Sequence, residues 1–374
     1  MDNKISRGLE GIVVCETSIS FINGKAGKLS YRGIPVETLA SNSSFEETAY
    51  LLWNDHLPNR LELQELEGKL REARELPREV LKVLFDLPKD LHYMDVLKTI
   101  LSLIGALDWR NSKDLYETAI KITSILPTII AYYYRYSNDL KIIPPNPSLN
   151  HIENFYWMCF ENLEDEELIK ALESCLILHM EQGLNASTFS SLVIGSTLSD
   201  MYSCVVGALG ALKGSLHGGA NERVLNMLEE VGAINNVEKY VEESFKLKRR
   251  IMGFGHRVYK TYDPRAVYIK ELLESVITDH NDELYKYLKI AEKLEEILVN
   301  NPVKRLYPNI DLYSGIFYSY LGFPRKMFTA LFALSRVVGW TAHVIEYTKN
   351  NRLFRPSSKY IGSMHKDYTP IDER

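Results

Sequence analysis

The stretch LYETAIKITSILPTIIAYYYRY, at residues 115–136, decides the fold class. Its apolar residues cover most of a helical circumference, which predicts a buried helix with a kink at Pro127. A second stretch, SLVIGSTLSDMYSCVVGALGAL at residues 191–212, has the same character and is rich in small residues. Small residues permit close helix–helix approach, including approach by a helix of another subunit. We therefore expect a large helical domain built around these two helices.

Most of the remaining chain is also patterned for helices. Segments with amphipathic helical spacing include residues 44–53, 61–74, 77–87, 93–107 and 222–231. The first thirty or so residues differ, because an Asn23-Gly24 turn joins short β-prone runs. Strand signals after residue 35 are weak. The predicted class is therefore mainly all-α, with a small N-terminal β-hairpin.

Composition excludes several classes of protein. Of 374 residues, 45% are hydrophobic and 25% charged, with a net charge of -5, so nucleic acid is not an expected partner. No apolar run approaches the ~20 residues that cross a bilayer. Residues 1–7 lack the apolar core of a secretory signal. Four scattered cysteines predict reduced thiols and a cytoplasmic location: Cys15, Cys159, Cys175 and Cys204.

The clearest chemical signal is GFGHRVYK at residues 253–260, followed by Asp263-Pro264-Arg265. It places His256 directly after a flexible Gly-x-Gly turn and surrounds it with cationic side chains. An imidazole in this position can hand a proton to a developing oxyanion, while Arg and Lys bind carboxylate or phosphate. The stretch predicts an enzyme that handles an anionic small molecule.

Two other short stretches carry candidate catalytic groups. Glycines flank His217 in KGSLHGGAN, residues 213–221, which predicts a neutral hydrogen-bond donor at a helix N-terminus. The alternative is a helix–helix turn with an incidental histidine. Asp311 in YPNIDLYSG, residues 307–315, is a candidate base if apolar neighbours raise its pKa, or else a helix N-cap. Nothing in the spacing of these groups supports a metal site.

Together with LSRVVGW at residues 334–340, these motifs in this order resemble those of citrate synthases, in the shorter form typical of archaea and many bacteria. The resemblance covers essentially the whole chain. It implies a mostly α-helical homodimer whose subunits have a large domain, residues 1–216 and 316–374, and a small mobile domain, residues 217–315. The implied reaction condenses acetyl-CoA with oxaloacetate and water to citrate and CoA, without a metal or redox cofactor.

The resemblance also implies a catalytic trio. Asp311 removes a proton from the acetyl methyl group of acetyl-CoA, and His217 stabilises the resulting enol or enolate oxygen. His256 polarises and protonates the ketone oxygen of oxaloacetate as the carbon–carbon bond forms. Citryl-CoA is then hydrolysed.

Further residues match the family's binding positions. Arg265 and Arg336 correspond to arginines that grip the oxaloacetate carboxylates by two-pronged bonds. The residues expected near CoA are Gly253, Phe254, Gly255, Arg257 and Lys260.

Two positions depart from the family pattern. Gln182 stands where the family usually has a histidine that contacts oxaloacetate, and it can donate a hydrogen bond but carries no charge. Ser357 replaces the second arginine of an Arg-Pro-Arg motif that reaches into the partner's site. Arg355 or Lys359 would have to compensate, and we assign Arg355 to the oxaloacetate set.

These departures leave two alternatives open. One is a 2-methylcitrate synthase, which prefers propionyl-CoA, or a related enzyme that condenses another 2-oxo acid. The other is a catalytically impaired paralogue that binds CoA. The intact trio argues against the second.

Overall fold

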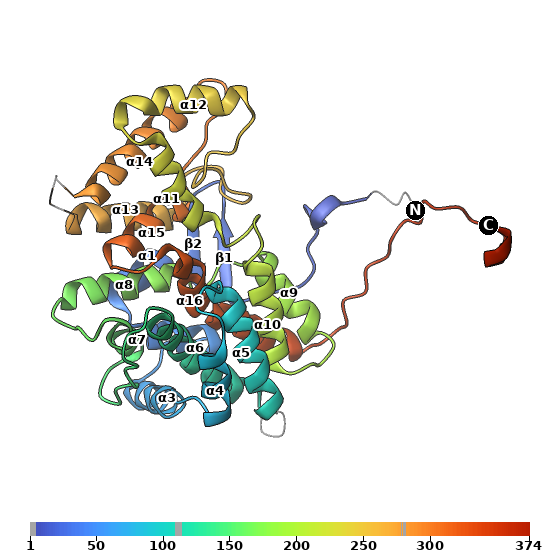
Figure 1. The fold of residues 1–374 in the computed structure, drawn as a ribbon, viewed down its shortest axis with the longest axis horizontal. Coiled ribbons are helices and arrows are strands. Elements are labelled where there is room, and N and C mark those ends of the chain that lie inside the picture. The colour runs from blue at the N-terminus through green and yellow to red at the C-terminus, as the bar shows by residue number, and fades with distance from the viewer. Residues whose placement is uncertain (1–4, 109–113, 278, 280–281) are drawn as a thin grey trace.

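The computed structural model describes residues 5–108, 114–277, 279 and 282–374, so the first four residues of the N-terminal segment lie outside it. The fold is mainly helical, as predicted (Figure 1). The helices are α1 (Val36–Asn42), α2 (Phe45–Asn54), α3 (Arg60–Glu72), α4 (Arg78–Asp86), α5 (Tyr93–Asp108), α6 (Leu115–Ser137), α7 (His151–Phe160), α8 (Glu166–His179), α9 (Ala186–Gly195), α10 (Met201–Leu212), α11 (Ala220–Val231), α12 (Val237–Lys246), α13 (Pro264–Val276), α14 (Glu283–Val299), α15 (Ile310–Tyr320) and α16 (Phe328–Thr348).

The predicted N-terminal hairpin is present. Strand β1 (Ser20–Asn23) pairs antiparallel with β2 (Lys28–Tyr31) across the Asn-Gly turn, and a two-residue strand β3 (Ile34–Pro35) extends the sheet. At the hairpin tip, Lys260 N donates to Gly24 O at 2.8 Å. A Cβ atom at Gly24 would lie 2.2 Å from Val258 O, so only glycine allows this contact. The hairpin therefore docks directly on the loop that carries His256.

Of the two core helices that we predicted, one is present as a single helix and the other is not. Helix α6 is buried along most of its length, as expected, but it continues through Pro127, where we expected a kink, without a break in helical conformation. The single helix predicted at residues 191–212 is wrong, because α9 ends at Gly195 and α10 begins at Met201. Leu198 takes a left-handed φ of 62°, and the Asp200 side chain caps α10 by accepting from Ser203 N. The chain thus reverses between the two helices.

Small residues of this region pack against other helices of the same chain. Helices α9 and α10 pack side by side, and a Cβ atom at Gly207 would meet Ile194 Cδ1 at 2.2 Å. On the next helix, a Cβ atom at Gly105 of α5 would lie 2.7 Å from Tyr202 Cβ. Glycine at position 105 is therefore required for the close approach of α5 and α10, whereas a side chain at position 207 would force only the end of the Ile194 side chain to move.

Helix α16 is the central helix of the fold. It packs against α2, α5, α6, α8, α9, α10 and α11, and its first seventeen residues are all buried. Within the described part of the chain, Arg325–Thr348 is the one segment long and apolar enough to cross a membrane by length and composition. We expected no such segment. Almost all of it lies inside the fold, which is the setting of a core helix.

The helices form two groups (Figure 1). Helices α11 to α15 gather on one side of the molecule, where α15 packs against α11, α13 and α14. The earlier helices and α16 form the other group. The segments before β1 and after α16 extend away from the helical body on one side.

We expect Gly339→Ala, on α16, to lower the free energy of unfolding by about 1–3 kcal/mol, as overpacked cores do. The new Cβ atom would lie 2.4 Å from Glu181 Oε2 and 2.5 Å from Met180 O. Glu181 cannot easily retreat, since His343 Nε2 holds its carboxylate at 3.0 Å. Urea denaturation measures the change. The control is Gly68→Ala on α3, where the new atom meets no described atom within 4 Å and should stabilise by about 0.5–1 kcal/mol. Equal effects of the two substitutions would contradict the steric explanation.

Candidate active site

A cavity of about 1840 Å³ brings together the three predicted catalytic residues. His217, His256 and Asp311 all line it, together with Gln182 and Arg265. His217 and Asp311 belong to the α11–α15 group, whereas Gln182 follows α8 in the other group. The cavity thus lies between the two groups of helices.

His217 sits in the tight turn between α10 and α11. Gly218 N donates to Leu212 O at 2.9 Å, and a Cβ atom at Gly218 would lie 2.7 Å from that oxygen, so the turn needs glycine. His217 Nε2 accepts from Ser187 N at 3.3 Å and lies 2.9 Å from Ser187 Oγ. With Nε2 used as an acceptor, the ring proton sits on Nδ1.

The same surroundings keep His217 uncharged. Burial, helped by Arg336, lowers its pKa to about 4. Trp340 Nε1 donates to Ser187 Oγ at 3.0 Å and so fixes the serine that orients the ring. His217 therefore offers one N–H group, which fits the expected neutral donor, and its catalytic role stays a prediction.

The loop that carries His256 is paired with the loop that precedes Asp311. Gly255 N donates to Tyr307 O at 2.8 Å, and Asn309 N donates to Gly253 O at 2.9 Å. Gly253 and Gly255 both have positive φ, at 76° and 80°. Glycine allows these left-handed conformations without strain, which explains the Gly-x-Gly pattern. Two of the sequence motifs thus form one structural unit.

His256 is held in one tautomer by its own loop. Val258 N and Tyr259 N donate to its Nδ1 atom at 3.0 and 3.1 Å, so Nε2 carries the proton of the neutral ring. Burial, helped by Arg265, lowers its pKa to about 4. His256 Nε2 lies 3.0 Å from the side-chain amide of Gln182.

Asp311 lies in the first turn of α15 but does not cap it. Asn309 is the N-cap, and its side chain accepts from Asp311 N at 3.0 Å. The alternative reading of Asp311 as an N-cap is therefore wrong. Burial raises the pKa of the Asp311 carboxyl to about 6, against the opposing effect of Arg265 and Arg336.

Two fully buried arginines present unpartnered N–H groups. Arg265 uses Nε and Nη2 on Asp263, at 2.9 and 2.7 Å, and Arg336 uses Nε on His179 O at 2.6 Å. Arg265 Nη1 and both Nη atoms of Arg336 have no partner among the described residues. Buried guanidinium nitrogens without acceptors are unfavourable. Arg265 lines the cavity, whereas Arg336 is not among its lining residues. Their free N–H groups suit the oxygens of an anionic ligand.

The outer part of the cavity is basic. Of the residues expected near CoA, four line it: Gly253, Phe254, Gly255 and Arg257. Lys260 does not, and its Nζ donates to Arg257 O at 3.0 Å. Sequence reasoning missed four other cations that line this part of the cavity: Lys248, Arg249, Arg250 and Lys304. The Lys-Arg-Arg run directly before the glycine motif was the signal that could have found three of them.

Arg355 does not line the cavity of its own chain. It is exposed on the extended segment after α16. Its assignment to the oxaloacetate set stays a prediction for a site completed by a second subunit.

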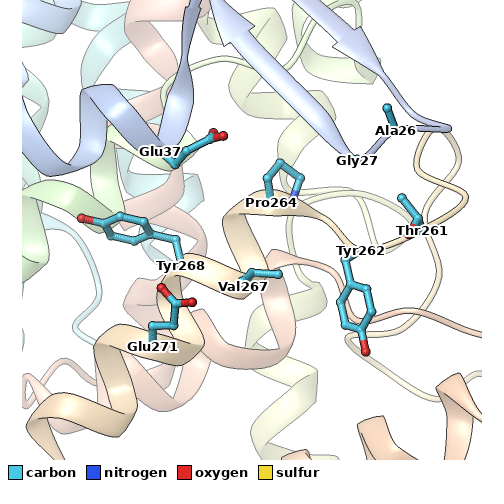
Figure 2. Close-up of a pocket in the computed structure, with 9 residues that line it drawn as sticks. All are labelled: Ala26, Gly27, Glu37, Thr261, Tyr262, Pro264, Val267, Tyr268 and Glu271. Atoms are coloured by element: carbon cyan, nitrogen blue, oxygen red, sulfur yellow. The ribbon is translucent and has the colours of Figure 1, made fainter.

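A second pocket, of about 380 Å³, lies between the hairpin, α1 and α13 (Figure 2). It contains none of the predicted site residues. Among the described residues, no group of three or more His, Cys, Asp and Glu side chains could hold a metal ion. The four cysteines are free thiols.

Comparison with known proteins agrees with the motifs. A family model described as "Citrate synthase, C-terminal domain" matches residues 8–357. A citrate synthase from Deinococcus radiodurans is 40% identical, covering 100% of both chains, and a 2-methylcitrate synthase from Mycobacterium tuberculosis is 39% identical, covering 96% of this chain and 91% of the relative.

Solved structures give the same match. The crystal structure of citrate synthase from Thermotoga maritima is 56% identical, with a TM-score of 0.92 and coverage of 99% of both chains. The citrate synthase from Thermoplasma acidophilum, in ternary complex with carboxymethyl coenzyme A and oxaloacetate, is 36% identical with a TM-score of 0.94, covering 99% of this chain and 100% of that one.

Proposed function

The chain belongs to the citrate synthase family, and we propose that its cavity condenses acetyl-CoA with oxaloacetate and water to citrate and CoA. The observation that carries the proposal is the set of three unpartnered guanidinium nitrogens, one on Arg265 near His256 and Asp311, and two on Arg336 near Asp311. Oxaloacetate supplies two carboxylates for these nitrogens and a ketone for His256. The complex of the Thermoplasma acidophilum enzyme with oxaloacetate and a CoA analogue supports this choice.

Enolate formation is the first step. The α-carbon of a thioester is a very weak acid, so a carboxylate can deprotonate it only if the developing oxyanion is stabilised at the same time. Asp311 is the base, and its raised pKa makes it a stronger one than an exposed aspartate. His217 donates its Nδ1–H to the thioester oxygen.

Condensation and hydrolysis follow. His256 donates its Nε2–H to the ketone oxygen, which draws electrons from the carbonyl carbon and leaves it open to attack by the enolate. Arg265 and Arg336 hold the carboxylates in the geometry for that attack. Hydrolysis of citryl-CoA then releases citrate and CoA, and no step requires a metal or redox cofactor.

The basic outer part of the cavity suits the CoA phosphates. Four cations line it and form no salt bridge among the described residues: Lys248, Arg250, Arg257 and Lys304. Side chains of this kind bind phosphate. Arg249 is also placed there but pairs with Glu230 at 2.8 Å. Gly253 to Gly255 offer backbone groups beside them.

We further propose that residues 217–315 form a mobile domain that closes on the rest, residues 1–216 and 316–374. Closure would exclude water and strengthen the hydrogen bonds to the enolate. The expected oxaloacetate-binding residues support this, because Arg265 lies within residues 217–315 whereas Gln182 and Arg336 lie outside them.

A homodimer is the proposed assembly. The segment after α16 exposes Ile361, Met364 and Tyr368 by 90%, 80% and 81%, and a second subunit would cover such apolar side chains. In that assembly Arg355 reaches the partner's cavity. The free thiols fit a reducing compartment, so we also propose a cytoplasmic location.

A 2-methylcitrate synthase is the second candidate, favoured by the relative of that name at 39% identity. The two reactions share their chemistry and differ only in a methyl group on the acyl chain. A paralogue that merely binds CoA remains the third reading and predicts no turnover.

A steady-state assay of CoA thiol release decides among these candidates. Acetyl-CoA and propionyl-CoA are each tested against oxaloacetate and other 2-oxo acids. We expect the highest kcat/KM with acetyl-CoA and oxaloacetate. A clear preference for propionyl-CoA would replace the first candidate with the second, and no release with any pair would leave only the third.

The pH dependence of turnover should report Asp311. Only the ionised carboxylate accepts a proton, so we expect kcat/KM to fall as the pH drops through about 6, the pKa of Asp311 in the free protein. Burial lowers the pKa values of His217 and His256 to about 4, so they do not cause this loss. A profile of kcat/KM against pH checks this. A midpoint near the value of an exposed aspartate, about 3.9, would contradict the raised pKa.

A further inference from the structure

The contact between Gln182 and His256 cannot be a bond between two nitrogens. The ring proton of His256 sits on Nε2, because two backbone N–H groups occupy Nδ1. The atom facing it at 3.0 Å is the amide nitrogen of Gln182, which is also a donor. A half-turn about the last side-chain bond exchanges the amide nitrogen and oxygen without other movement. With its oxygen toward the ring, Gln182 accepts the proton that His256 offers.

We propose that Gln182 is a reversible cap on His256. In the empty site its amide oxygen holds the Nε2–H of the ring. The ketone oxygen of the 2-oxo acid displaces this oxygen, and the amide NH₂ group then donates to a carboxylate of the same ligand. The inference rests on the proposed function, because it takes a 2-oxo acid as the ligand.

An amide is suited to both states. It carries an acceptor and two donors on one rotor, so a single side chain satisfies the ring before binding and the carboxylate after it. In the empty site the cap occupies the donor of His256 and keeps the ring oriented. Gln182 is therefore a positioning residue for His256 as well as a ligand contact.

The cap also carries no charge at any pH. A histidine at position 182 would titrate near neutrality and make the affinity for a dicarboxylate depend on pH. Glutamine at this position adds no such dependence. Tyr259 lies against both members of the pair, its ring centroid 4.8 Å from that of His256. The other charged or titratable groups nearby are Glu181 with its partner His343, His179, His217, Lys260, Asp263, Arg265, Asp311 and Arg336.

A test of how oxaloacetate affinity depends on pH must use proteins in which Asp311 is replaced, because its pKa of about 6 lies within the pH range to be tested. His179, His217 and His256 have pKa values of about 3, 4 and 4, so they stay neutral there. Binding is therefore compared between Asp311→Asn and Asp311→Asn/Gln182→His. His343 is present in both proteins, so its contribution cancels in the comparison.

The first experiment records ¹⁵N spectra of the full-length protein labelled at histidine, without ligand. We expect His256 as the Nε2–H tautomer, and we expect Gln182→Met to move its Nε2 resonance while the His217 signals stay in place. The Nδ1–H tautomer, or an unmoved His256 signal in Gln182→Met, would overturn the cap. This test does not depend on the substrate.

The second experiment measures oxaloacetate binding by calorimetry from about pH 5.5 to about 8.5, the span in which an ordinary histidine titrates. For Asp311→Asn we expect a Kd that stays constant within about twofold. For the double variant we expect a Kd about tenfold tighter at the acid end than at the alkaline end, the size of one charge-assisted hydrogen bond. Gln182→Met in the same background should bind about tenfold more weakly at every pH.

Each result has a separate meaning. A strong pH dependence in Asp311→Asn, or unchanged affinity in Gln182→Met, would each overturn the role of Gln182 as a ligand contact. Absence of oxaloacetate binding to any of the proteins would instead overturn the proposed substrate. The histidine spectra would then still decide whether Gln182 caps the ring in the empty site.

Discussion

Replacing Asp311 with asparagine should lower kcat by about 10²–10⁴-fold, the usual contribution of a positioned general base. The amide has nearly the shape of the carboxyl group but cannot accept a proton from the acetyl methyl group. Oxaloacetate binding should survive, because the free guanidinium nitrogens of Arg265 and Arg336 are untouched. Thiol release measures turnover, and calorimetry measures the Kd for oxaloacetate.

The matched control is Asp282→Asn in the same group of helices. Asp282 caps α14 by accepting from Leu284 N at 2.8 Å, and asparagine caps a helix about as well as aspartate. This variant should therefore keep its turnover and stability. Near-normal turnover of Asp311→Asn would show that another group is the base.

Arg336→Met should weaken oxaloacetate binding by about 10²–10⁴-fold, if each of two charge-assisted hydrogen bonds contributes about 1.5–3 kcal/mol. Both Nη atoms of Arg336 are buried and unpartnered, so in the empty protein they contribute no hydrogen bond to stability. Burial lowers the pKa of this guanidinium to about 10, because the low-dielectric interior disfavours its charged form. The free energy of unfolding should fall by no more than about 1 kcal/mol, for the lost bond to His179 O.

Arg74 provides the contrast. It is as deeply buried, but its Nη atoms donate to Asn146 O and Leu149 O at 2.8 and 2.9 Å. Arg74→Met should therefore lose stability and leave the KM for oxaloacetate unchanged. If Arg336→Met behaves like Arg74→Met, the role of Arg336 is structural and the dicarboxylate is held elsewhere.

The sequence predicted those helices and strands whose formation depends on interactions between residues close together in the chain. The helix at residues 44–53 is present because Ser44 and Glu47 form a capping box, a signal contained in four consecutive residues. The break between α9 and α10 was missed because the apolar pattern continued through it. The capping signal of Asp200 was present in the sequence, but the periodicity outweighed it in our interpretation.

The site was predictable where a motif carries its own geometry. The Gly-x-Gly turn and His256 form such a case, since the loop itself supplies both donors to Nδ1. The contact of His256 with Gln182 could not be predicted, because 74 residues separate them. Nor could the sequence show that Arg336 keeps two nitrogens free, since that depends on the groups the fold brings around it.

The central position of α16 has a consequence for how the chain folds. Trp53 Nε1 donates to Thr341 Oγ1, and Ser18 Oγ donates to Glu346 Oε1, across 288 and 328 residues. The helix that the first half of the protein packs against is therefore synthesised long after that half. Contacts so distant in sequence form slowly. The nascent chain must wait with its apolar helix faces uncovered, and it cannot complete its core until α16 has left the ribosome.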